Sequence, residues 1–280
     1  EQCVVETTET ATCVTIKPSK DVSSDSLQNP SDPDAGYCGH KGKGYQVQVM
    51  ETYSPDKTQP DLITHVSVEA AHESDANALL PAIEDTKKRN MAPTELLADT
   101  LYGSDENIET AKEMGVEVVA PAMGTREQAI TLADFQFSET DEITACPVGQ
   151  LPQKINVGKN GGLTVHFNKT VCDNCPQQSN CPVNRQKNRC TISYDAKSLR
   201  LARRRKQEQT PEFKERYRYR AGAEATMSDL DRVTAIKHLR VRGMIPVRVA
   251  ATLKATGLNI RRAAAFIIRG GRLKGEPIPV

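Results

Sequence analysis

The sequence predicts an α/β fold in which helices cover a mixed β-sheet. Two segments alternate apolar and polar residues as half-buried strands do, GYQVQVMETY at 44–53 and DLITHVSVEA at 61–70. Turn-forming residues fill 54–60 between them, which predicts a hairpin. Farther on, residues 96–121 favour a strand, a helix and a second strand, the unit that joins parallel strands by a crossover. A hairpin that leads into such a crossover gives a mixed sheet.

The elements before the crossover follow from local composition. Residues 1–36 are expected to form an irregular arm: 14–16 favours a short strand, and 17–35 is rich in Ser, Asp, Pro and Asn without periodicity. Residues 74–89 repeat apolar side chains at helical spacing, which predicts the helix that follows the hairpin.

Asp99 ends the apolar run that opens the crossover unit. Ser104 is placed to cap a helix over 105–114, and Gly115 is placed to end it. Because side chains at the carboxyl end of a strand line the ligand crevice of open α/β sheets, Asp99 is a candidate functional residue. A lone Asp at a strand end can also merely cap a turn, and both interpretations stay open.

The last third is expected to be helical. Pro211 opens a helix over 212–220, a second follows over 224–242, and a third over 246–268 is expected to break at Gly257. Within the first two, spacings of three and four residues place Tyr217, Arg220 and Glu224 on one helix face. An Arg four residues before a Glu is also an ordinary surface ion pair.

Charge is distributed unevenly along the 280 residues. Residues 1–145 hold 10 Lys and Arg against 27 Asp and Glu, whereas 146–280 hold 27 against 9. Two segments concentrate the positive charge: 184–220 has 13 basic and 4 acidic residues, and 237–274 has 10 basic and no acidic ones. Two such blocks in one half favour a polyanionic partner over a merely solvated surface.

Cysteines gather in the polar segment 125–190. The pattern is Cys146, then Cys172-x2-Cys175, then Cys181, with a Gly-rich turn at 158–162. Four thiols within about 40 residues match the ligand number of a closed tetrahedral Zn²⁺ site of zinc-ribbon type. Disulfides or buried free thiols are the alternative, and disulfides are rare in reducing compartments. Cys190 is a spare or alternative ligand.

No apolar run approaches the roughly 20 residues of a membrane span, and no signal-peptide pattern opens the sequence. A cytoplasmic location is therefore expected.

Four motifs together resemble the DDE transposases of bacterial insertion sequences, which have an RNase H-like catalytic core. They are SDPDAGYCGHKGKGYQVQVMETY at 31–53, ADTLYGSDEN at 98–107, the CPVG and CDNCPQQSNC blocks, and Tyr217-x2-Arg220-x3-Glu224 followed by IKHLRVRG at 236–243. The resemblance covers nearly the whole chain. It implies an RNase H-like mixed sheet flanked by helices, with a Cys-rich insertion and a helical C-terminal region.

The resemblance also implies roles for residues. Asp99 matches the second catalytic aspartate and Glu224 the catalytic glutamate, which would bind Mg²⁺ (or Mn²⁺), while the cysteine cluster would bind Zn²⁺. The family often has a Lys seven residues after the Glu, where this sequence has Asp231. Residues expected to contact DNA are Tyr217, Arg220, Arg203, Arg204, Arg205, Lys206, Lys237, Arg240 and Arg242.

The family's first catalytic aspartate lies in an Asp-Ser/Gly-Thr context upstream of the SDPDA block. No such context occurs in residues 1–30, and the available aspartates lie in the predicted arm: Asp21, Asp25, Asp32 and Asp34. We therefore expect the sequence to begin after that strand and after the DNA-binding helices that precede it.

The expected organisation has five parts. These are an irregular arm at 1–36, the RNase H-like core at 37–124 and 205–245, a Cys-rich zinc-ribbon-like insertion at 125–192, a basic linker at 193–204, and a helical tail at 246–280. The function expected is metal-dependent cleavage and transfer of DNA strands, on transposon ends and target duplex, by a nucleoid-associated homo-oligomer. The alternatives are a non-catalytic, zinc-bearing DNA-binding protein derived from this fold and a metal-dependent nuclease without strand transfer.

Overall fold

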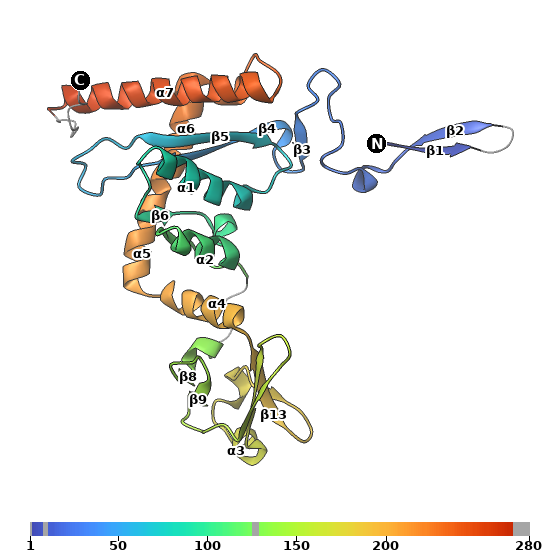
Figure 1. The fold of residues 1–280 in the computed structure, drawn as a ribbon, viewed down its shortest axis with the longest axis vertical. Helices are drawn as coiled ribbons and strands as arrows, with labels where there is room; N and C mark the ends of the chain where they lie inside the picture. Colours follow the sequence, from blue (N-terminus) through green and yellow to red (C-terminus); the bar gives the residue numbers. More distant parts are fainter. Residues whose placement is uncertain (1, 8–10, 125–128, 271–280) are drawn as a thin grey trace. The chain divides into compact units, whose positions relative to one another are not determined.

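The computed structural model describes residues 2–7, 11–124 and 129–270 (Figure 1). Parts of the expected arm, insertion and tail, at 1, 8–10, 125–128 and 271–280, lie outside the described residues. The chain divides into two compact units. The first comprises Glu1–Leu96, Glu113–Val116 and Tyr219–Val280, and the second Leu97–Lys112 and Glu117–Arg218. The fold is mixed α/β, as the sequence predicts, but its strands form several small sheets rather than the single mixed sheet expected.

The first unit is built on an antiparallel sheet of β3 (Gly36–Cys38), β4 (Gly42–Glu51) and β5 (Ile63–Ala70). The predicted hairpin is confirmed: β4 and β5 pair in the register Val47↔Val68 and Val49↔Val66. Upstream of it, β1 (Cys3–Thr7) and β2 (Thr12–Ile16) form a separate exposed hairpin.

Helices cover both faces of this sheet (Figure 1). On one face, α6 (Ala221–Thr234) and α7 (Met244–Ile268) enclose a core that includes Val68, Leu230 and Leu258. On the other, α1 (Leu79–Lys88) lies against β5, and His65 contacts Asp85 across this interface at 2.6 Å. The alternation places Val47, Val49, Val66 and Val68 on the face covered by α6 and α7, whereas polar side chains such as His65 lie on the face toward α1.

Two predicted features of the last helices are wrong. Gly257 does not break α7, which runs on as one helix. Ala255 and Leu258 beside it are buried against the sheet, and this packing outweighs the low helix propensity of glycine. The helix expected over 224–242 begins earlier and ends at Thr234, where Ala235 adopts a left-handed conformation with φ of 50°. Such a residue commonly closes a helix.

The second unit contains the crossover segment and the cysteine-rich segment. The crossover is present as β6 (Glu95–Leu97), α2 (Asp105–Glu113) and β7 (Glu117–Val119), with β6 and β7 paired as neighbours; Glu95 and Leu96 of β6 belong to the first unit. These two strands and β3–β4–β5 are assigned to different sheets. The RNase H-like connectivity of the core stays a prediction.

The cysteine-rich segment forms its own four-stranded antiparallel sheet, in the order β10-β11-β13-β12. Its core combines Val165, Phe167, Ile192 and Leu199 with the two most buried cysteines. The elements of this segment and of the helices after it are β8 (Gln136–Phe137), β9 (Ile143–Ala145), β10 (Lys154–Val157), β11 (Leu163–Phe167), α3 (Lys169–Asp173), β12 (Asn184–Arg185), β13 (Cys190–Tyr194), α4 (Ala196–Gln207) and α5 (Pro211–Tyr217).

In the described part of the chain, no helix combines the length and the apolar character needed to cross a bilayer.

Candidate functional site

Asp99 follows β6 directly and begins a 3-10 turn, Thr100–Tyr102. Its Oδ1 accepts a hydrogen bond from the Thr100 amide at 2.7 Å, and the side chain is half-buried. Just before it, the amide of Ala98 donates to the carbonyl of Val119 at 3.0 Å, which fixes the end of the strand. A carboxylate can accept about four hydrogen bonds or metal contacts, so capping this turn is compatible with a ligand role.

The turn after Asp99 is held rigidly. Ser104 accepts a hydrogen bond from the Asn107 amide at 3.1 Å through its Oγ, which confirms the predicted helix cap. Gly103 approaches Ala120 so closely that an added Cβ would lie 2.8 Å from the Ala120 Cβ. Only glycine fits there without a shift of the backbone. Residues of the ADTLYGSDEN motif therefore fix the turn that follows Asp99, the candidate metal ligand.

The basic run of α4 is engaged within the protein. Arg204 donates to the carbonyls of Gly103 and Ala120 at 3.0 and 3.2 Å, and burial lowers its pKa. Each neighbour also has a partner: Arg203 pairs with Asp141 at 2.7 Å and lies over the Phe137 ring, Arg205 donates to the Met123 carbonyl, and Lys206 pairs with Asp134 at 2.8 Å. DNA contact by these four residues stays a prediction.

Glu224 lies in the first turn of α6, where the helix dipole favours a carboxylate. Its Oε1 accepts from Arg220 Nη1 at 2.5 Å, and the Glu224 side chain is 68% exposed. Tyr217, which precedes them, stacks on Phe213 with ring centroids 5.6 Å apart. The structure therefore brings Arg220 and Glu224 together. Asp99 belongs to the second unit and Glu224 to the first, and that they share one site stays a prediction.

A buried ionic network that sequence reasoning missed holds the helix of Glu224. Thr226 Oγ1 donates to Glu51 Oε2 at 2.5 Å, and Arg262 Nη1 donates to the same oxygen at 2.9 Å. The Glu51 and Arg262 side chains are only 12% and 19% exposed. The network joins β4, α6 and α7 two residues beyond Glu224. The one signal in the sequence was an acidic residue at the end of an alternating strand.

The aspartates of the SDPDA block also have a structural role. Asp32 is buried and accepts from Tyr45 Oη at 2.5 Å and from the Gly243 amide at 2.9 Å. Asp34 accepts from the Met244 amide at 2.7 Å, so the two carboxylates together cap the start of α7. Burial, followed by the hydrogen bond to Asp32, raises the pKa of Tyr45 above its usual range.

The remaining basic candidates lie between α6 and α7. Lys237 pairs with Asp231 at 3.2 Å and lowers the pKa of that carboxyl group below its ordinary value. Asp231 occupies the position where the resemblance leads one to expect a Lys, and Lys237 places a positive charge beside it. Arg240 and Arg242 are exposed.

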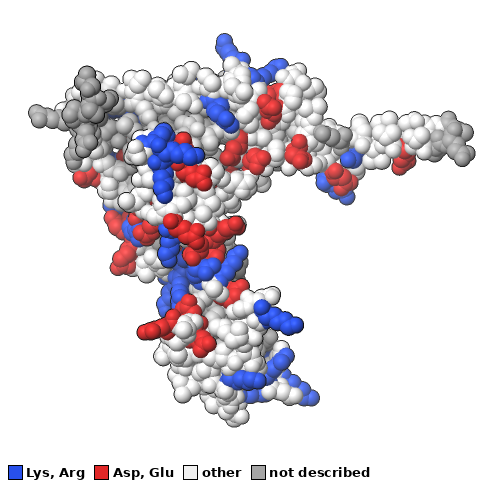
Figure 2. Space-filling view, viewed as in Figure 1, with Lys and Arg blue, Asp and Glu red and all other residues white. Residues whose placement is uncertain are grey.

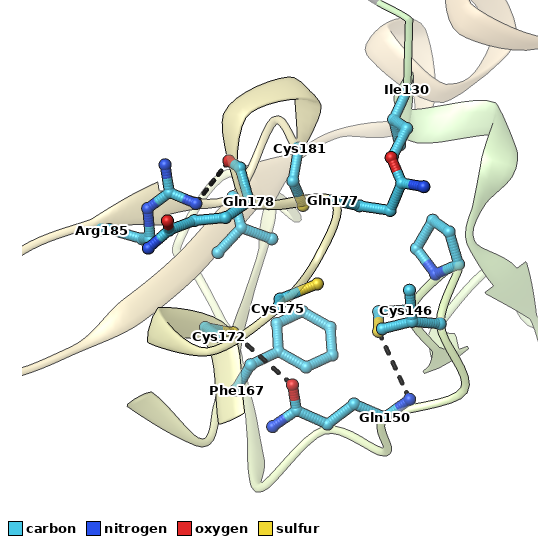
Figure 3. A pocket seen from close by; sticks show the side chains of 13 residues that line it. Ile130, Cys146, Gln150, Phe167, Cys172, Cys175, Gln177, Gln178, Cys181 and Arg185 are labelled. Atoms are coloured by element: carbon cyan, nitrogen blue, oxygen red, sulfur yellow. Dashed lines mark hydrogen bonds between the residues drawn. The ribbon is translucent and has the colours of Figure 1, made fainter. Parts of the chain in front are cut away.

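Four cysteines line one small cavity of about 20 Å³ (Figure 3). They are the predicted Zn²⁺ ligands Cys146, Cys172, Cys175 and Cys181, with the ring of Phe167 among them. All eight cysteines of the chain are free thiols. Burial, followed by the nearby Cys190, raises the pKa of Cys172 to about 12.

The cavity is large enough for one ion or one water molecule. Across the described ranges, however, no three metal-ligating side chains are arranged to hold an ion. The four predicted ligands therefore line one cavity, and binding of Zn²⁺ by them stays a prediction.

Comparison with known proteins finds a family model that matches part of the chain. Neither the curated proteins nor the solved structures include a significant match to this chain. Residues 145–264 match the family model described as a transposase DDE domain, and this segment contains Cys146, the other three cavity cysteines and Glu224. Asp99 lies outside the matched segment. The match supports a DDE-type transposase; it contains the cysteine blocks and the Tyr217-x2-Arg220-x3-Glu224 motif, whereas the motifs at 31–53 and 98–107 lie outside it.

Proposed function

We propose that this chain is a DDE transposase that cleaves and transfers DNA strands with the help of divalent metal ions. The observation that carries the proposal is the match to a transposase DDE domain over 145–264, which includes Glu224 and its partner Arg220. This match favours strand cleavage over the non-catalytic DNA-binding alternative. It leaves metal dependence, the identity of the metal and oligomerisation as proposals.

Asp99 and Glu224 are the proposed ligands of Mg²⁺ or Mn²⁺. Carboxylate oxygens suit these ions, which keep several waters and bind phosphate oxygens in addition. When bound, such ions stabilise the attacking and leaving oxygens of an in-line displacement at phosphorus. Both carboxylates sit on ordered elements, Asp99 at the capped turn after β6 and Glu224 in the first turn of α6.

Arg220 is the proposed phosphate contact beside Glu224. Its ion pair to Glu224 uses Nη1, and a guanidinium carries five N–H donors in a fixed fork. We propose that the same side chain holds the Glu224 carboxylate in place and contacts a phosphate when DNA is bound. Tyr219 stacks on Tyr53 with centroids 5.4 Å apart, which steadies the segment that carries Arg220.

The test is a pair of conservative substitutions, Asp99→Asn and Glu224→Gln, in the longest reading frame that contains residues 1–280. Each should abolish Mg²⁺-dependent cleavage of plasmid DNA and weaken Mn²⁺ binding measured by electron paramagnetic resonance, while duplex binding persists. The matched control is Glu215→Gln, which breaks an exposed ion pair to Arg218 of similar geometry. Cleavage that survives both substitutions would overturn the proposal.

We further propose that the cysteine cavity binds one Zn²⁺ ion as a structural site. Four sulfur ligands are the usual set for such sites, and the cavity has the volume of a single ion. The raised pKa of Cys172 means that the metal must displace protons to bind, so affinity should rise with pH.

Elemental analysis tests this second proposal. The purified chain should hold about one Zn²⁺, and Cys172→Ser or Cys175→Ser should remove it. Cys13→Ser is the control, because Cys13 is an exposed thiol in β2, far along the chain from the cavity. Equal zinc content in all four proteins, or none in any, would count against the site.

A further inference from the structure

The cysteine-rich sheet has one apolar face and one polar face. Ile155, Val165 and Ile192 stand in register across β10, β11 and β13 and face the core. Because side chains alternate along a strand, their neighbours lie on the opposite face. These neighbours form two polar rows across the sheet, Asn156–Thr164–Ser193 and Lys154–His166–Thr191–Asn184.

The polar face is hollow and its side chains are already organised. All residues of the two rows except Lys154 line a depression of about 390 Å³, to which Gln186 and Arg189 are added from the β12–β13 turn. Asn156 and His166 are hydrogen-bonded at 3.0 Å between Nδ2 and Nε2, and Thr164 and Ser193 at 2.9 Å between their hydroxyls. An antiparallel sheet commonly exposes one polar face, so polarity alone would indicate nothing. The depression and the positive charge around it are the additional features that indicate a binding surface.

Positive charge surrounds this depression. Residues 143–194 contain six Lys and Arg and a single acidic residue, Asp173, which pairs with Lys169 at 2.6 Å. Arg189 lines the depression, Lys154 belongs to one polar row, and Lys159 lies in the β10–β11 turn. Where the structure describes the chain, none of these three forms an ion pair with an acidic side chain. In Figure 2, Lys and Arg side chains lie along the edge of the molecule near β13, and Asp and Glu side chains lie on the other edge of this module.

We propose that this polar face, defined by the two rows and Arg189, binds the backbone of duplex DNA. Lys154, Lys159 and Arg189 would contact phosphates, and the amide and hydroxyl groups of the rows would complete the hydrogen bonds. Four strands spaced about 4.8 Å apart span about 15 Å, which corresponds to about four phosphates of one DNA strand when they are counted along the helix axis. The inference rests on the proposed function only because a transposase acts on DNA, and it involves neither Asp99 nor Glu224.

The composition of the face favours duplex over single-stranded DNA. Proteins that bind single strands stack the bases on aromatic rings. The depression is lined by no Phe or Tyr among the described residues, and the chain contains no Trp. Phe167 and Tyr194, the aromatic residues of β11 and β13, are buried on the opposite face at 3% and 6% exposure.

The experiment measures binding of the full chain to a 30-base-pair duplex of mixed sequence by fluorescence anisotropy. The triple substitution Lys154→Gln, Lys159→Gln and Arg189→Gln should weaken binding at least about tenfold. Since each phosphate contact contributes about 0.9 to the dependence of log K on log salt, the slope should fall by about 2 to 3. The control variant, Lys87→Gln with Lys88→Gln and Lys112→Gln, removes the same charge from α1 and α2. Equal weakening in both variants would overturn the proposal.

Acetylation protection locates the contact without any substitution. The duplex should protect Lys154 and Lys159 of the wild-type chain, and leave Lys87 and Lys88 reactive. Protection that is absent, or that a 30-nucleotide single strand produces equally well, would overturn the assignment. Failure of Asp99→Asn to alter cleavage, with protection intact, would refute the proposed catalysis alone. Intact cleavage without protection would refute this surface alone.

Discussion

At the residue scale, two glycines of this chain differ in the space that a side chain would find around them. Gly257 lies within α7 on its exposed side, where an added Cβ meets nothing within 4 Å. Gly103 follows the Asp99 turn, where an added Cβ would lie 2.8 Å from the Ala120 Cβ and 3.1 Å from the Pro121 carbonyl oxygen.

The two alanine substitutions should therefore change stability in opposite directions. Gly257→Ala should raise the free energy of unfolding by about 0.5–1 kcal/mol, because alanine costs less conformational entropy in a helix. Gly103→Ala should lower it by about 1–3 kcal/mol through overpacking. Urea denaturation at pH 7 measures both. A loss of stability in Gly257→Ala would show that the glycine has a function on that face of α7.

The ion pair between Asp105 and Arg200 gives a prediction about pH. Arg200 donates from Nη2 to Asp105 Oδ2 at 2.6 Å, and this hydrogen bond is the main reason that the pKa of Asp105 is lowered. A carboxylate whose pKa is lower in the folded state stabilises the protein above its unfolded value, and that contribution is lost as the pH falls through the folded value.

Asp105→Asn should accordingly cost about 1 kcal/mol at pH 7, a modest value because Arg200 is 38% exposed. The difference from the wild type should shrink as the pH falls below about 4 and the wild-type carboxylate becomes protonated. Thermal unfolding from pH 7 to pH 3 measures this. A difference that is constant over the whole range would mean that Asp105 acts by packing rather than charge.

At the scale of elements, α7 shows how polar contacts position an apolar helix. Its start is capped by Asp32 and Asp34, and Arg262 binds Glu51. Between them, Asn259 accepts a hydrogen bond from the Ile63 amide of β5 and donates one to the Ile63 carbonyl. Apolar burial attaches the helix to the sheet, and these polar contacts at three points along α7 fix its position along the strand.

Loss of the first of these contacts should be costly. Asp32→Ala leaves the Gly243 amide and the Tyr45 hydroxyl without their acceptor, and should reduce the free energy of unfolding by about 2–3 kcal/mol. Asp25→Ala, in the same segment but exposed, should change it by less than about 0.5 kcal/mol. Chemical denaturation compares the two. Equal effects would mean that Asp32 does not anchor α7.

At the scale of the whole molecule, local sequence patterns predicted elements better than their assembly. The alternation of 44–53 and 61–70 sets the β4–β5 hairpin because the period of a strand is local, and Ser104 sets the start of α2 for the same reason. Gly257 misled because tertiary burial of Leu258 overrides a weak local propensity.

Partners distant in sequence could not be predicted from single residues. Glu51 and Arg262 are 211 positions apart, and Asp32 and Gly243 also 211 apart, so nothing in either local pattern identifies the other. The basic run at 203–206 suggested only DNA, although its carbonyl and carboxylate partners lie 62 to 101 positions earlier in the chain. The candidate pair Arg220 and Glu224, by contrast, was predictable because helical periodicity alone places them together.

The division into two units with separate cores predicts that the chain unfolds in more than one step. Leu258 belongs to the core of the first unit and Leu199 to the core of the second, and both are 1% exposed. Leu258→Ala and Leu199→Ala remove the same atoms from equally buried positions, and each should cost its own unit about 2–5 kcal/mol. Native-state hydrogen exchange distinguishes them: Leu258→Ala should speed exchange of the β4 and β5 amides, and Leu199→Ala that of the β11 and β13 amides. Because all-or-none unfolding would transmit either loss to every protected amide, equal acceleration in both sheets would show that the two cores form one cooperative unit.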